Sequence, residues 1–374
     1  MIEKYFASYV RGLTFDGEKG LFVHTLCPDC GKKPELVFGA DSDQWKTEFE
    51  KWTCSNGKFP SVVGFASNEL LLGLGTTYDE AAKASGVSRK PSEKASGSRA
   101  DVVRGKVCVV TGGAQGFGEG MVRSLSANGA FVFVADMNTD GAKAVADSLN
   151  KSAGATVAAA VGVNVTDEQS VEKMADEIES LTGGMDLFVS NAGVLRAGSV
   201  KELSLKDFQF VTSVDYMGFF VCTKYAARLL AVQHSACADY QTDIVCISSK
   251  SGLQGSNKNG AYAGAKFGVI GLVQSFALEL VTDNVKVNAI CPGNFLNGPL
   301  WSDPVRGLFV QYLNAGKVPG AKTVADVRAF YEAKVPMRRG CETSDVMRAM
   351  LYIVEQKYET GQAVPVTGGQ VMLN

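Results

Sequence analysis

The sequence contains very little histidine, no excess of basic charge and no long uncharged apolar run. Its only histidines are His24 and His234, too few for a histidine-rich metal cluster. The 37 Lys and Arg residues nearly balance 39 Asp and Glu, giving a net charge of −2, which argues against nucleic acid as a partner. No apolar run approaches the ~18 residues that span a bilayer. Residues 1–10 are charged and lack an apolar core, so we expect neither a membrane segment nor a signal peptide.

Glycine, in contrast, is abundant. It makes up 41 of 374 residues, about 11%, against a usual ~7%. Such an excess indicates many tight turns, or a backbone that approaches a ligand closely. A content of 46% apolar and 20% charged residues is typical of a globular protein rather than a disordered one. Six of the nine cysteines are scattered through apolar segments, which predicts reduced, buried thiols in a cytoplasmic protein: Cys108, Cys222, Cys237, Cys246, Cys291 and Cys341.

A stretch rich in Ser, Lys, Gly and Ala divides the chain. Residues 86–103 contain a single proline and almost no large apolar side chain, a composition typical of a linker. We therefore expect a small N-terminal α/β module in residues 1–85 and a larger domain in residues 104–374.

After the linker, short apolar runs alternate with longer amphipathic ones. The expected strands are 106–111, 131–136, 156–163, 186–190, 243–248 and 285–290, and the expected helices are 115–128, 140–151, 167–181, 215–230 and 261–280. This alternation predicts βαβ units, and thus a parallel sheet with helices on both faces. Right-handed crossovers then favour an α/β fold of the Rossmann type, with a doubly wound sheet.

A glycine-rich turn, TGGAQGFG, follows the first expected strand and precedes a helix. Gly112, Gly116 and Gly118 permit a tight turn, close approach of the backbone to a pyrophosphate and close packing of the helix. The amides at the start of that helix favour phosphate. Asp136 ends the next strand, where a carboxylate binds the ribose hydroxyls of NAD and repels the 2′-phosphate of NADP. These features predict an NAD site; the alternative is an ordinary turn with an N-terminal helix cap.

A tyrosine and a lysine lie four residues apart in an expected helix. Tyr262 and Lys266 therefore share one helix face, and the ammonium is expected to lower a phenol pKa that starts near ~10. A phenol tuned in this way can exchange a proton with an alcohol or a carbonyl. Ser249 ends an expected strand upstream, where its hydroxyl can hold the substrate oxygen. The alternative is an ordinary amphipathic helix.

These motifs together resemble those of the short-chain dehydrogenase/reductase family. TGGAQGFG, SNAG at 190–193, ISSKSG, YAGAK and CPGN at 291–294 occur in the order and at the spacing of that family, over about residues 104–374. The resemblance implies a seven-stranded Rossmann sheet, a nicotinamide cofactor and hydride transfer at a carbon that carries oxygen. It also implies a homotetramer or a homodimer.

The resemblance further implies roles for individual residues. Tyr262 is the general acid/base, Lys266 lowers its pKa and binds the nicotinamide ribose, and Ser249 orients the substrate. Asn191 is placed beside the adenine ribose. The implied cofactor-binding residues are Gly112, Gln115, Gly116, Phe117, Gly118, Asp136, Asn164, Val165, Asn191, Ala192, Gly193, Tyr262, Lys266, Pro292 and Asn294.

Three positions depart from the family pattern. Asp215 replaces the helix asparagine that completes the proton relay; its carboxylate can still hold a water, but its charge is expected to raise the pKa of Tyr262. Asn164 replaces an aspartate near the adenine, and Asn297 replaces a threonine that contacts the nicotinamide amide. These departures concern details of the mechanism and not the class of reaction. We keep Asp215 as a predicted catalytic residue.

The region between the sixth strand and the last helix is long for this family. It carries basic residues that suggest a phosphorylated substrate, although a solvated surface is the more usual explanation of such residues: Arg306, Lys317, Lys322, Lys334, Arg338 and Arg339. SSKSG, NKNGAYAGAK, KVPMRRGC and TGQAVPVTGGQVM resemble hexitol-phosphate dehydrogenases of the family. That resemblance implies oxidation of a hexitol 6-phosphate at C2 to a ketose phosphate with NAD.

We expect the phosphate to be bound by Lys250, Lys258 and either Arg338 or Arg339, with Asn294 also near the substrate. One alternative is a dehydrogenase of an unphosphorylated polyol or another secondary alcohol. An acyl-carrier reductase is disfavoured by the acidic residue of the expected NAD site, because biosynthetic reductases generally use NADPH. A non-catalytic NAD-binding scaffold is disfavoured by the intact Ser, Tyr and Lys set.

The first 85 residues contain a candidate zinc site and a second, weaker resemblance. His24, Cys27, Cys30 and Cys54 are of the types that bind zinc, and CPDCGK resembles one knuckle of a zinc ribbon. A second Cys-x-x-Cys pair is absent, so free cysteines in a loop are the alternative. Residues 60–84 resemble the last strands and helix of a class II sugar-phosphate aldolase domain. The segment is too short for an aldolase, so we expect a remnant that serves as a structural or oligomer-contact module.

Overall fold

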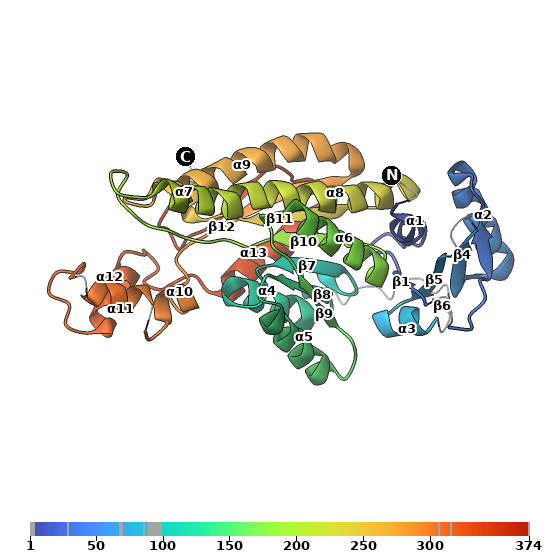
Figure 1. Ribbon diagram of the computed structural model, residues 1–374, viewed down its shortest axis with the longest axis horizontal. Coiled ribbons are helices and arrows are strands. Elements are labelled where there is room, and N and C mark those ends of the chain that lie inside the picture. Colours follow the sequence, from blue (N-terminus) through green and yellow to red (C-terminus); the bar gives the residue numbers. More distant parts are fainter. Residues whose placement is uncertain are drawn as a thin grey trace.

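The computed structural model of the chain is shown in Figure 1. It describes residues 4–27, 30–66, 70–84, 87–88, 99–305, 307–314 and 316–372. The middle of the expected linker, residues 89–98, and Arg306 lie outside the described residues.

The centre of the molecule is a parallel sheet of seven strands. Their order is β13-β12-β11-β10-β7-β8-β9, and every neighbouring pair is parallel. The strands are β7 (Val107–Thr111), β8 (Phe131–Asp136), β9 (Ala158–Gly162), β10 (Leu187–Ser190), β11 (Thr242–Ile247), β12 (Val285–Pro292) and β13 (Ala363–Val366). The predicted doubly wound Rossmann-type sheet is thereby confirmed, and the predicted strands agree with it to within two residues at most ends.

Helices cover both faces of this sheet (Figure 1). One face carries α4 (Gly116–Ala127), α5 (Thr139–Ala153) and α13 (Thr343–Glu355), and the other carries α6 (Glu168–Thr182), α8 (Gly218–Ala236) and α9 (Gly260–Leu280). The packing of strand β7 between two cores explains why its sequence is continuously apolar. Val107 and Val109 enter one core, whereas Cys108 and Val110 enter the other, as the period-two alternation of a strand requires.

Side-chain caps and glycines set the limits of the helices. Helix α6 begins after Asp167, whose side chain accepts hydrogen bonds from the amides of Gln169 and Ser170. It ends at Gly183, which has a φ of +74° and so adopts the left-handed conformation that favours glycine. Part of the glycine excess therefore lies at helix ends.

The predicted start of the helix at residues 215–230 is wrong. The structure has α7 (Leu205–Thr212), then a π-helical turn at Ser213–Met217, and only then α8. A π-helical turn inserts an extra residue into the helix and re-aims its side chains. This turn contains Asp215, so the irregularity lies where the candidate site needs a specific side-chain direction.

Helix α9 corrects a second expectation. Residues Gly260–Asp283 form the one helix of the described chain that is long and apolar enough to cross a membrane. Val269, Val273 and Ala277 of this helix nevertheless belong to the core, and the helix packs along β12. Burial against the sheet explains part of its apolar character, and the stretch is 33% buried.

Five of the six scattered cysteines are buried, as predicted, and the sixth, Cys237, is half-buried. The three cysteines of the N-terminal module are exposed: Cys27, Cys30 and Cys54.

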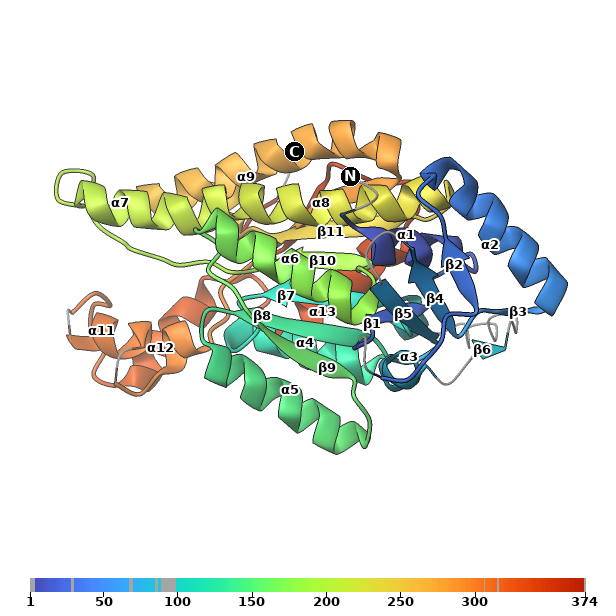
Figure 2. The ribbon, with the colours of Figure 1, turned by 45° about the vertical axis from the view of Figure 1, so that its right-hand side comes forward.

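A separate lobe follows β12. It contains α10 (Pro299–Ser302), α11 (Leu308–Asn314) and α12 (Val324–Ala333), and it has its own small core around Trp301, which packs against the rings of Phe309 and Tyr331. Figures 1 and 2 show this lobe at the end of the sheet opposite the N-terminal module.

The N-terminal module is a small α/β unit, as predicted. Its four strands have the order β1-β5-β4-β2, and β3 pairs with β6. The elements are α1 (Phe6–Leu13), β1 (Phe22–Thr25), β2 (Leu36–Phe38), α2 (Ser42–Asn56), β3 (Lys58–Phe59), β4 (Val62–Phe65), β5 (Leu70–Gly75), α3 (Tyr78–Lys83) and β6 (Val87–Ser88). Aromatic rings of this unit share one core with the central sheet.

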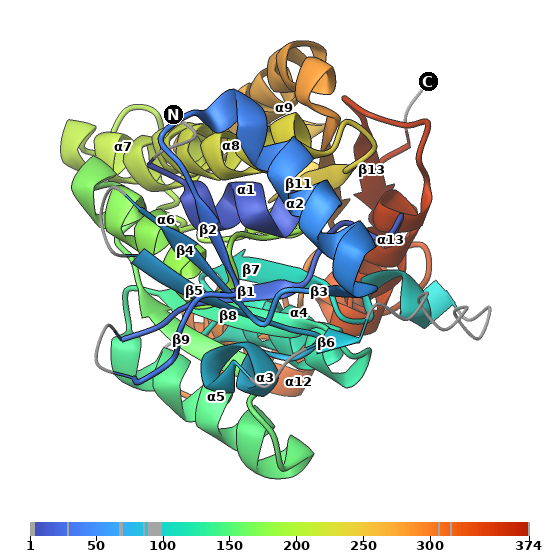
Figure 3. The same ribbon diagram turned by 90° about the vertical axis from the view of Figure 1, so that its right-hand side faces the viewer.

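Helix α1 lies against α8 of the large domain (Figure 3). A Cβ atom at Gly12 would clash with the carbonyl oxygen of Gln233 and would lie 2.7 Å from the Cβ of Ala236. Only glycine therefore allows the two helices to approach this closely. The last residues of the expected linker, Arg99–Val103, form the 3-10 turn η1, and Val103 is buried in the core.

Candidate active site

The glycine-rich turn between β7 and α4 has the shape that its sequence predicts. Gly112 and Gly116 have φ values of +66° and +60°, in the left-handed region. A Cβ atom at Gly118 would clash with the carbonyl oxygen of Gly112 and lie 2.6 Å from Nδ2 of Asn191. The turn is thus a cradle that side chains would fill, which fits the pyrophosphate of a dinucleotide.

Asn191 and Thr111 hold this cradle in place. Thr111 Oγ1 accepts hydrogen bonds from the amides of Asn191 (3.0 Å) and Ala192 (3.1 Å). Asn191 Nδ2 donates to the carbonyl oxygens of Thr111 (2.9 Å) and Gly112 (3.2 Å). Sequence reasoning did not single out Thr111, although its place directly before the first glycine was the available signal.

Asp136 lies at the mouth of the cradle, at the end of β8. Its Oδ2 accepts a hydrogen bond from the amide of Ala114 (3.0 Å), and its Oδ1 accepts one from the amide of Asn138 (2.9 Å). Each carboxylate oxygen has a second lone pair that can accept from a ribose hydroxyl. The carboxylate is therefore fixed where the ribose of a bound dinucleotide would lie.

The two predicted cofactor residues after β9 are held locally. Asn164 Oδ1 accepts from the amide (3.1 Å) and the hydroxyl (2.8 Å) of Thr166. Val165 is buried and lies against Gly218. A Cβ atom at Gly218 would lie 3.0 Å from Cγ2 of Val165. Both residues therefore shape the loop that follows the strand.

The predicted catalytic residues come from two elements that pack closely together. Tyr262 and Lys266 lie on α9, and Ser249 precedes the 3-10 turn η3 (Lys250–Gly252), accepting from the amide of Ser251 at 3.1 Å. A Cβ atom at Gly252 would lie 2.5 Å from the carbonyl oxygen of Lys266, so η3 lies directly on α9. This contact brings the serine and the tyrosine of the predicted set together.

Lys266 is held from three sides. Its Nζ lies 5.6 Å from the centre of the Tyr262 ring, donates to the carbonyl oxygen of Ile247 at 3.1 Å and lies 3.4 Å from Oδ2 of Asp215. Its own carbonyl accepts from the hydroxyl of Ser248 at 3.0 Å, a contact that sequence reasoning did not foresee.

The structure brings Asp215 into this group. Its Oδ1 accepts from the amide of Val194 at 2.7 Å, whereas Oδ2 is paired with Lys266 but has no hydrogen bond among the described residues. Burial raises the pKa of Asp215. Burial alone would lower the pKa of Lys266, but the attraction of Asp215 and Tyr262 outweighs it and raises that pKa, so the ammonium persists.

The net pKa of Tyr262 differs from the expectation. Burial of the phenol raises its pKa above the ordinary value, and the Asp215 carboxylate adds to this shift. The Lys266 ammonium and a hydrogen bond with Ser249 lower it, as predicted, but they do not outweigh burial. Burial therefore outweighs the lowering effects that the sequence predicts, because residue order does not reveal that the phenol is partly buried.

The predicted phosphate-binding residues lie in different settings. Lys250 is half-buried and follows Ser249 directly. Lys258 has a φ of +56°, and its carbonyl accepts from the amide of Gly198 at 2.8 Å. Arg338 donates to the carbonyl oxygen of Ala333 at 3.0 Å.

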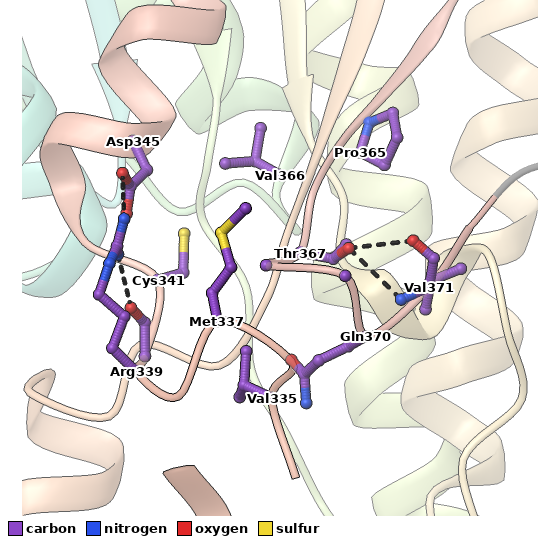
Figure 4. A pocket seen from close by; sticks show the side chains of 13 residues that line it. Val335, Met337, Arg339, Cys341, Asp345, Pro365, Val366, Thr367, Gln370 and Val371 are labelled. Carbon is purple, nitrogen blue, oxygen red and sulfur yellow. Dashed lines mark hydrogen bonds and ion pairs between the residues drawn. The ribbon is translucent and has the colours of Figure 1, made fainter. Parts of the chain in front are cut away.

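Arg339 faces a separate cavity of about 380 Å³ between residues 335–341 and the turn after β13. Figure 4 shows Arg339 paired with Asp345 at one side of this cavity, at distances of 2.5 and 2.9 Å. Apolar side chains, including Met337 and Val366, form much of its wall. None of the four predicted catalytic residues lines it, so this cavity is separate from the predicted catalytic group.

The segment after β12 is tied to the lobe and to α13. The carbonyl of Asn294 accepts from the amide of Cys341 at 2.9 Å. Asn297, at the position of the family threonine, donates to Glu342 and accepts from Arg328, each at 2.5 Å. The Asn297 side chain thus connects α12 to the start of α13.

The candidate zinc ligands are not gathered into a site. His24 Nδ1 bonds with the carbonyl of Leu181 at 3.0 Å, and its ring packs on Tyr78. Among the residues that the structure describes, no three His, Cys, Asp or Glu side chains are grouped to hold a metal ion.

Comparisons with known proteins agree with this geometry. A family model described as short chain dehydrogenase matches residues 106–302. Sorbitol-6-phosphate 2-dehydrogenase of Escherichia coli (strain K12) is 37% identical over 269 residues, which are 71% of this chain and 99% of that protein. Meso-2,3-butanediol dehydrogenase of Serratia marcescens is 35% identical over 64% of this chain and 96% of its own length. A crystal structure of sorbitol-6-phosphate 2-dehydrogenase from Erwinia amylovora has a TM-score of 0.65 and 36% identity, covering 71% of this chain and 100% of that one.

Proposed function

Because the chain belongs to the short-chain dehydrogenase family, we propose that it is an NAD-dependent oxidoreductase that interconverts a sugar alcohol phosphate and a ketose phosphate. Sorbitol 6-phosphate and fructose 6-phosphate are the substrate pair that its similarity to sorbitol-6-phosphate 2-dehydrogenases favours. The observation that carries the proposal is the arrangement of Ser249, Tyr262 and Lys266 beside a glycine cradle.

Each residue of this group has a step that its position supports. Ser249 donates a hydrogen bond to the C2 oxygen, and Tyr262 accepts the proton of the C2 hydroxyl. Tyr262 accepts this proton in its phenolate form and becomes the neutral phenol; Lys266 stabilises the phenolate before the transfer, and Asp215 holds the Lys266 ammonium in place. NAD, when bound, supplies the acceptor for the hydride that leaves C2. The free lone pairs of Asp215 Oδ2 can hold a water that carries the proton away.

The preference for NAD rests on Asp136. Its carboxylate is fixed by two backbone amides at the mouth of the cradle. A second negative charge, on the 2′-phosphate of NADP, would be repelled there.

Turnover of a substrate panel tests the proposal. We expect oxidation of sorbitol 6-phosphate with NAD to exceed that of other hexitols and hexitol phosphates, and to be much slower with NADP. Tyr262→Phe should lower kcat by at least about a hundredfold, because it removes the group that moves the proton. Tyr352→Phe on α13, which removes a hydrogen bond to Glu359, is the matched control. An absence of turnover by the folded wild-type chain with every member of the panel would contradict the enzyme assignment and favour a non-catalytic scaffold.

A dehydrogenase of an unphosphorylated polyol or another secondary alcohol is the second candidate. The similarity to meso-2,3-butanediol dehydrogenase favours it. Equal kcat/KM for sorbitol and sorbitol 6-phosphate would support this candidate against the first.

We also propose that residues 1–85 are a structural module, an aldolase-like remnant, of a cytoplasmic homotetramer or homodimer with no membrane or nucleic-acid partner. The close packing of α1 on α8 supports a structural role. Exposed apolar side chains on α8 and α9, such as Phe220, Phe267 and Leu278, support self-association. Deletion of residues 1–95 should alter assembly or stability and leave the chemistry in place. Loss of turnover in a folded, correctly assembled truncation would contradict this role.

A further inference from the structure

Two phenylalanine rings stack between the glycine-rich turn and the segment that follows β12. The ring centres of Phe117 and Phe295 are 4.2 Å apart, and the ring planes differ by 15°. Phe117 is at the start of α4, between Gly116 and Gly118 of the turn, whereas Phe295 lies shortly after the end of β12. Both residues are half-buried. The stack therefore joins two segments that are far apart in the chain.

The chain after Phe295 turns back closely on its ring. The amide of Gly298 donates to the carbonyl oxygen of Phe295 at 2.9 Å, and a Cβ atom at Gly298 would lie 2.5 Å from Cδ1 of Phe295. The residue between them in the sequence that follows directly, Leu296, is fully buried in the core of the lobe. A tight turn and an anchored neighbour therefore set the position of the Phe295 ring.

The stack connects the two ends of the candidate dinucleotide site. The glycine-rich turn follows β7 and fits a pyrophosphate. Hydride transfer beside Ser249 and Tyr262 requires the nicotinamide to lie near them, at the carboxyl end of β11. Strand β12 is the neighbour of β11, and the amide of Ser248 donates to the carbonyl oxygen of Ile290 at 2.8 Å. The segment that carries Phe295 therefore starts beside the reacting groups and reaches back to the turn.

We propose that Phe117 and Phe295 are positioning residues whose stack fixes the pyrophosphate end of the site relative to its nicotinamide end before the dinucleotide binds. The inference rests on the proposed function and goes beyond it, since it assigns a pair of residues to the spacing of the cofactor subsites. Such preorganisation raises affinity, because a flexible segment need not be ordered during binding. A ligand that occupies only the pyrophosphate end gains nothing from the stack.

Calorimetric titration of the full chain with NADH and with ADP-ribose, which lacks the nicotinamide, tests the assignment. We expect Phe295→Leu to weaken NADH binding by about twofold to tenfold, the usual contribution of an aromatic pair, and to leave ADP-ribose binding unchanged. Phe295→Tyr keeps the ring and should bind NADH within about twofold of the wild type. Gly298→Ala keeps both phenylalanines but displaces the Phe295 ring, so it should reproduce the effect of Phe295→Leu.

Phe15→Leu is the matched control. The rings of Phe15 and Tyr240 are also stacked, with centres 4.3 Å apart, but Tyr240 precedes β11 and so lies at the amino ends of the strands. This variant should bind NADH and ADP-ribose as the wild type does.

A double-mutant cycle identifies how the two rings act. Phe117→Leu, Phe295→Leu and the double variant should weaken NADH binding by the same factor, because either change alone breaks the stack. Losses that multiply in the double variant would show that each ring acts on the dinucleotide independently, and would overturn the proposal. Unchanged NADH binding by Phe295→Leu, or an equal loss of NADH and ADP-ribose affinity, would also overturn it.

These titrations need no substrate, so they separate the positioning role from the proposed function. If the expected binding pattern is seen but no hexitol or hexitol phosphate is oxidised, the positioning role stands and the proposed substrate is wrong. If sorbitol 6-phosphate is oxidised but the binding pattern is absent, the proposed function stands and the positioning role is wrong.

Discussion

At the residue scale, Asp215 has the largest consequence for the chemistry. It replaces an asparagine of the family pattern and places a buried carboxylate 3.4 Å from the ammonium of Lys266. The same charge raises the pKa of Tyr262. The pKa of Tyr262, the proposed acid/base group, is therefore shifted by two opposite charges, of which only the lysine belongs to the family pattern.

Replacing Asp215 with asparagine should shift the pH dependence of oxidation. Removing the carboxylate lowers the pKa of Tyr262, so the acidic limb of kcat/KM should move to lower pH by about one unit. The pH–rate profile measures this shift. Asp243→Asn is the control, because Asp243 also forms a buried pair with a lysine, Lys286 at 2.9 Å, but at the amino ends of the strands. A shift of the same size in both variants would contradict the role of Asp215.

A second prediction at this scale concerns Gly118. Gly118→Ala places a methyl group against the carbonyl oxygen of Gly112, so the helix must move away from the turn. We expect NAD affinity to fall at least about tenfold and the free energy of unfolding to fall by about 1–3 kcal/mol. Calorimetric titration with NAD and thermal unfolding measure these changes.

Gly271→Ala is the matched control for Gly118→Ala. A Cβ atom at Gly271 meets nothing within 4 Å, and alanine is the better helix former in α9 by about 1 kcal/mol. Unchanged NAD binding by Gly118→Ala would show that the turn does not require a close approach of the helix.

At the element scale, the start of α1 is held by a side chain of another domain. The amide of Ala7 donates to Oε1 of Glu179 on α6 at 2.8 Å. Burial nevertheless raises the pKa of Glu179 to about 7, so its ionised form is less favourable in the folded chain than in the unfolded one. The docking of α1 thus contains a group that titrates near neutrality.

The pH dependence of stability follows from this shift. The pKa of Glu179 is higher in the folded chain than in the unfolded chain. The contribution of Glu179 to the free energy of unfolding should therefore be lost as the pH rises from about 4.5 to about 7. Glu179→Gln keeps an acceptor for the Ala7 amide and cannot ionise. The free energy of unfolding of this variant should be close to that of the wild type at pH 5 and should exceed it at pH 8 by up to about 3 kcal/mol. Thermal unfolding at the two pH values measures the difference. An equal difference at both pH values would contradict the assignment.

At the scale of the whole molecule, the N-terminal module completes the polar interior of the large domain. Arg11 is fully buried, and its guanidinium pairs with Asp186 at 2.7 Å and donates to the hydroxyl of Tyr240 at 3.1 Å. Asp186 Oδ2 accepts from the amide of Val107 at 2.7 Å, next to two central strands. Asp186 thus depends on the module for its counter-charge.

Arg11→Met should therefore destabilise the whole chain. The substitution leaves Asp186 buried without its paired cation, which should lower the free energy of unfolding by about 3–5 kcal/mol. The kinetic constants of the folded protein should stay near those of the wild type, because the pair lies at the amino ends of the strands. Urea unfolding measures the loss. Lys4→Met, which removes an exposed pair with Glu172 at 2.6 Å, should cost less than about 1 kcal/mol. Equal losses in both variants would contradict the structural role of Arg11.

The sequence by itself determined the architecture of residues 104–374 and the local parts of the site. Apolar runs long enough for one strand, separated by amphipathic helices, admit few arrangements besides a doubly wound sheet. The glycine turn and the spacing of Tyr262 and Lys266 depend on backbone conformation within one segment. Such local features are encoded by residues close together in the chain.

Only the tertiary structure decided how distant segments meet. The π-helical turn at Asp215, the partial burial of Tyr262 and the pairing of Arg11 with Asp186 all depend on contacts between residues far apart in the sequence. Electrostatic effects depend on distance and burial, and neither is visible in residue order. The sequence therefore identified the groups that we propose do the chemistry, and the fold set their charges and surroundings.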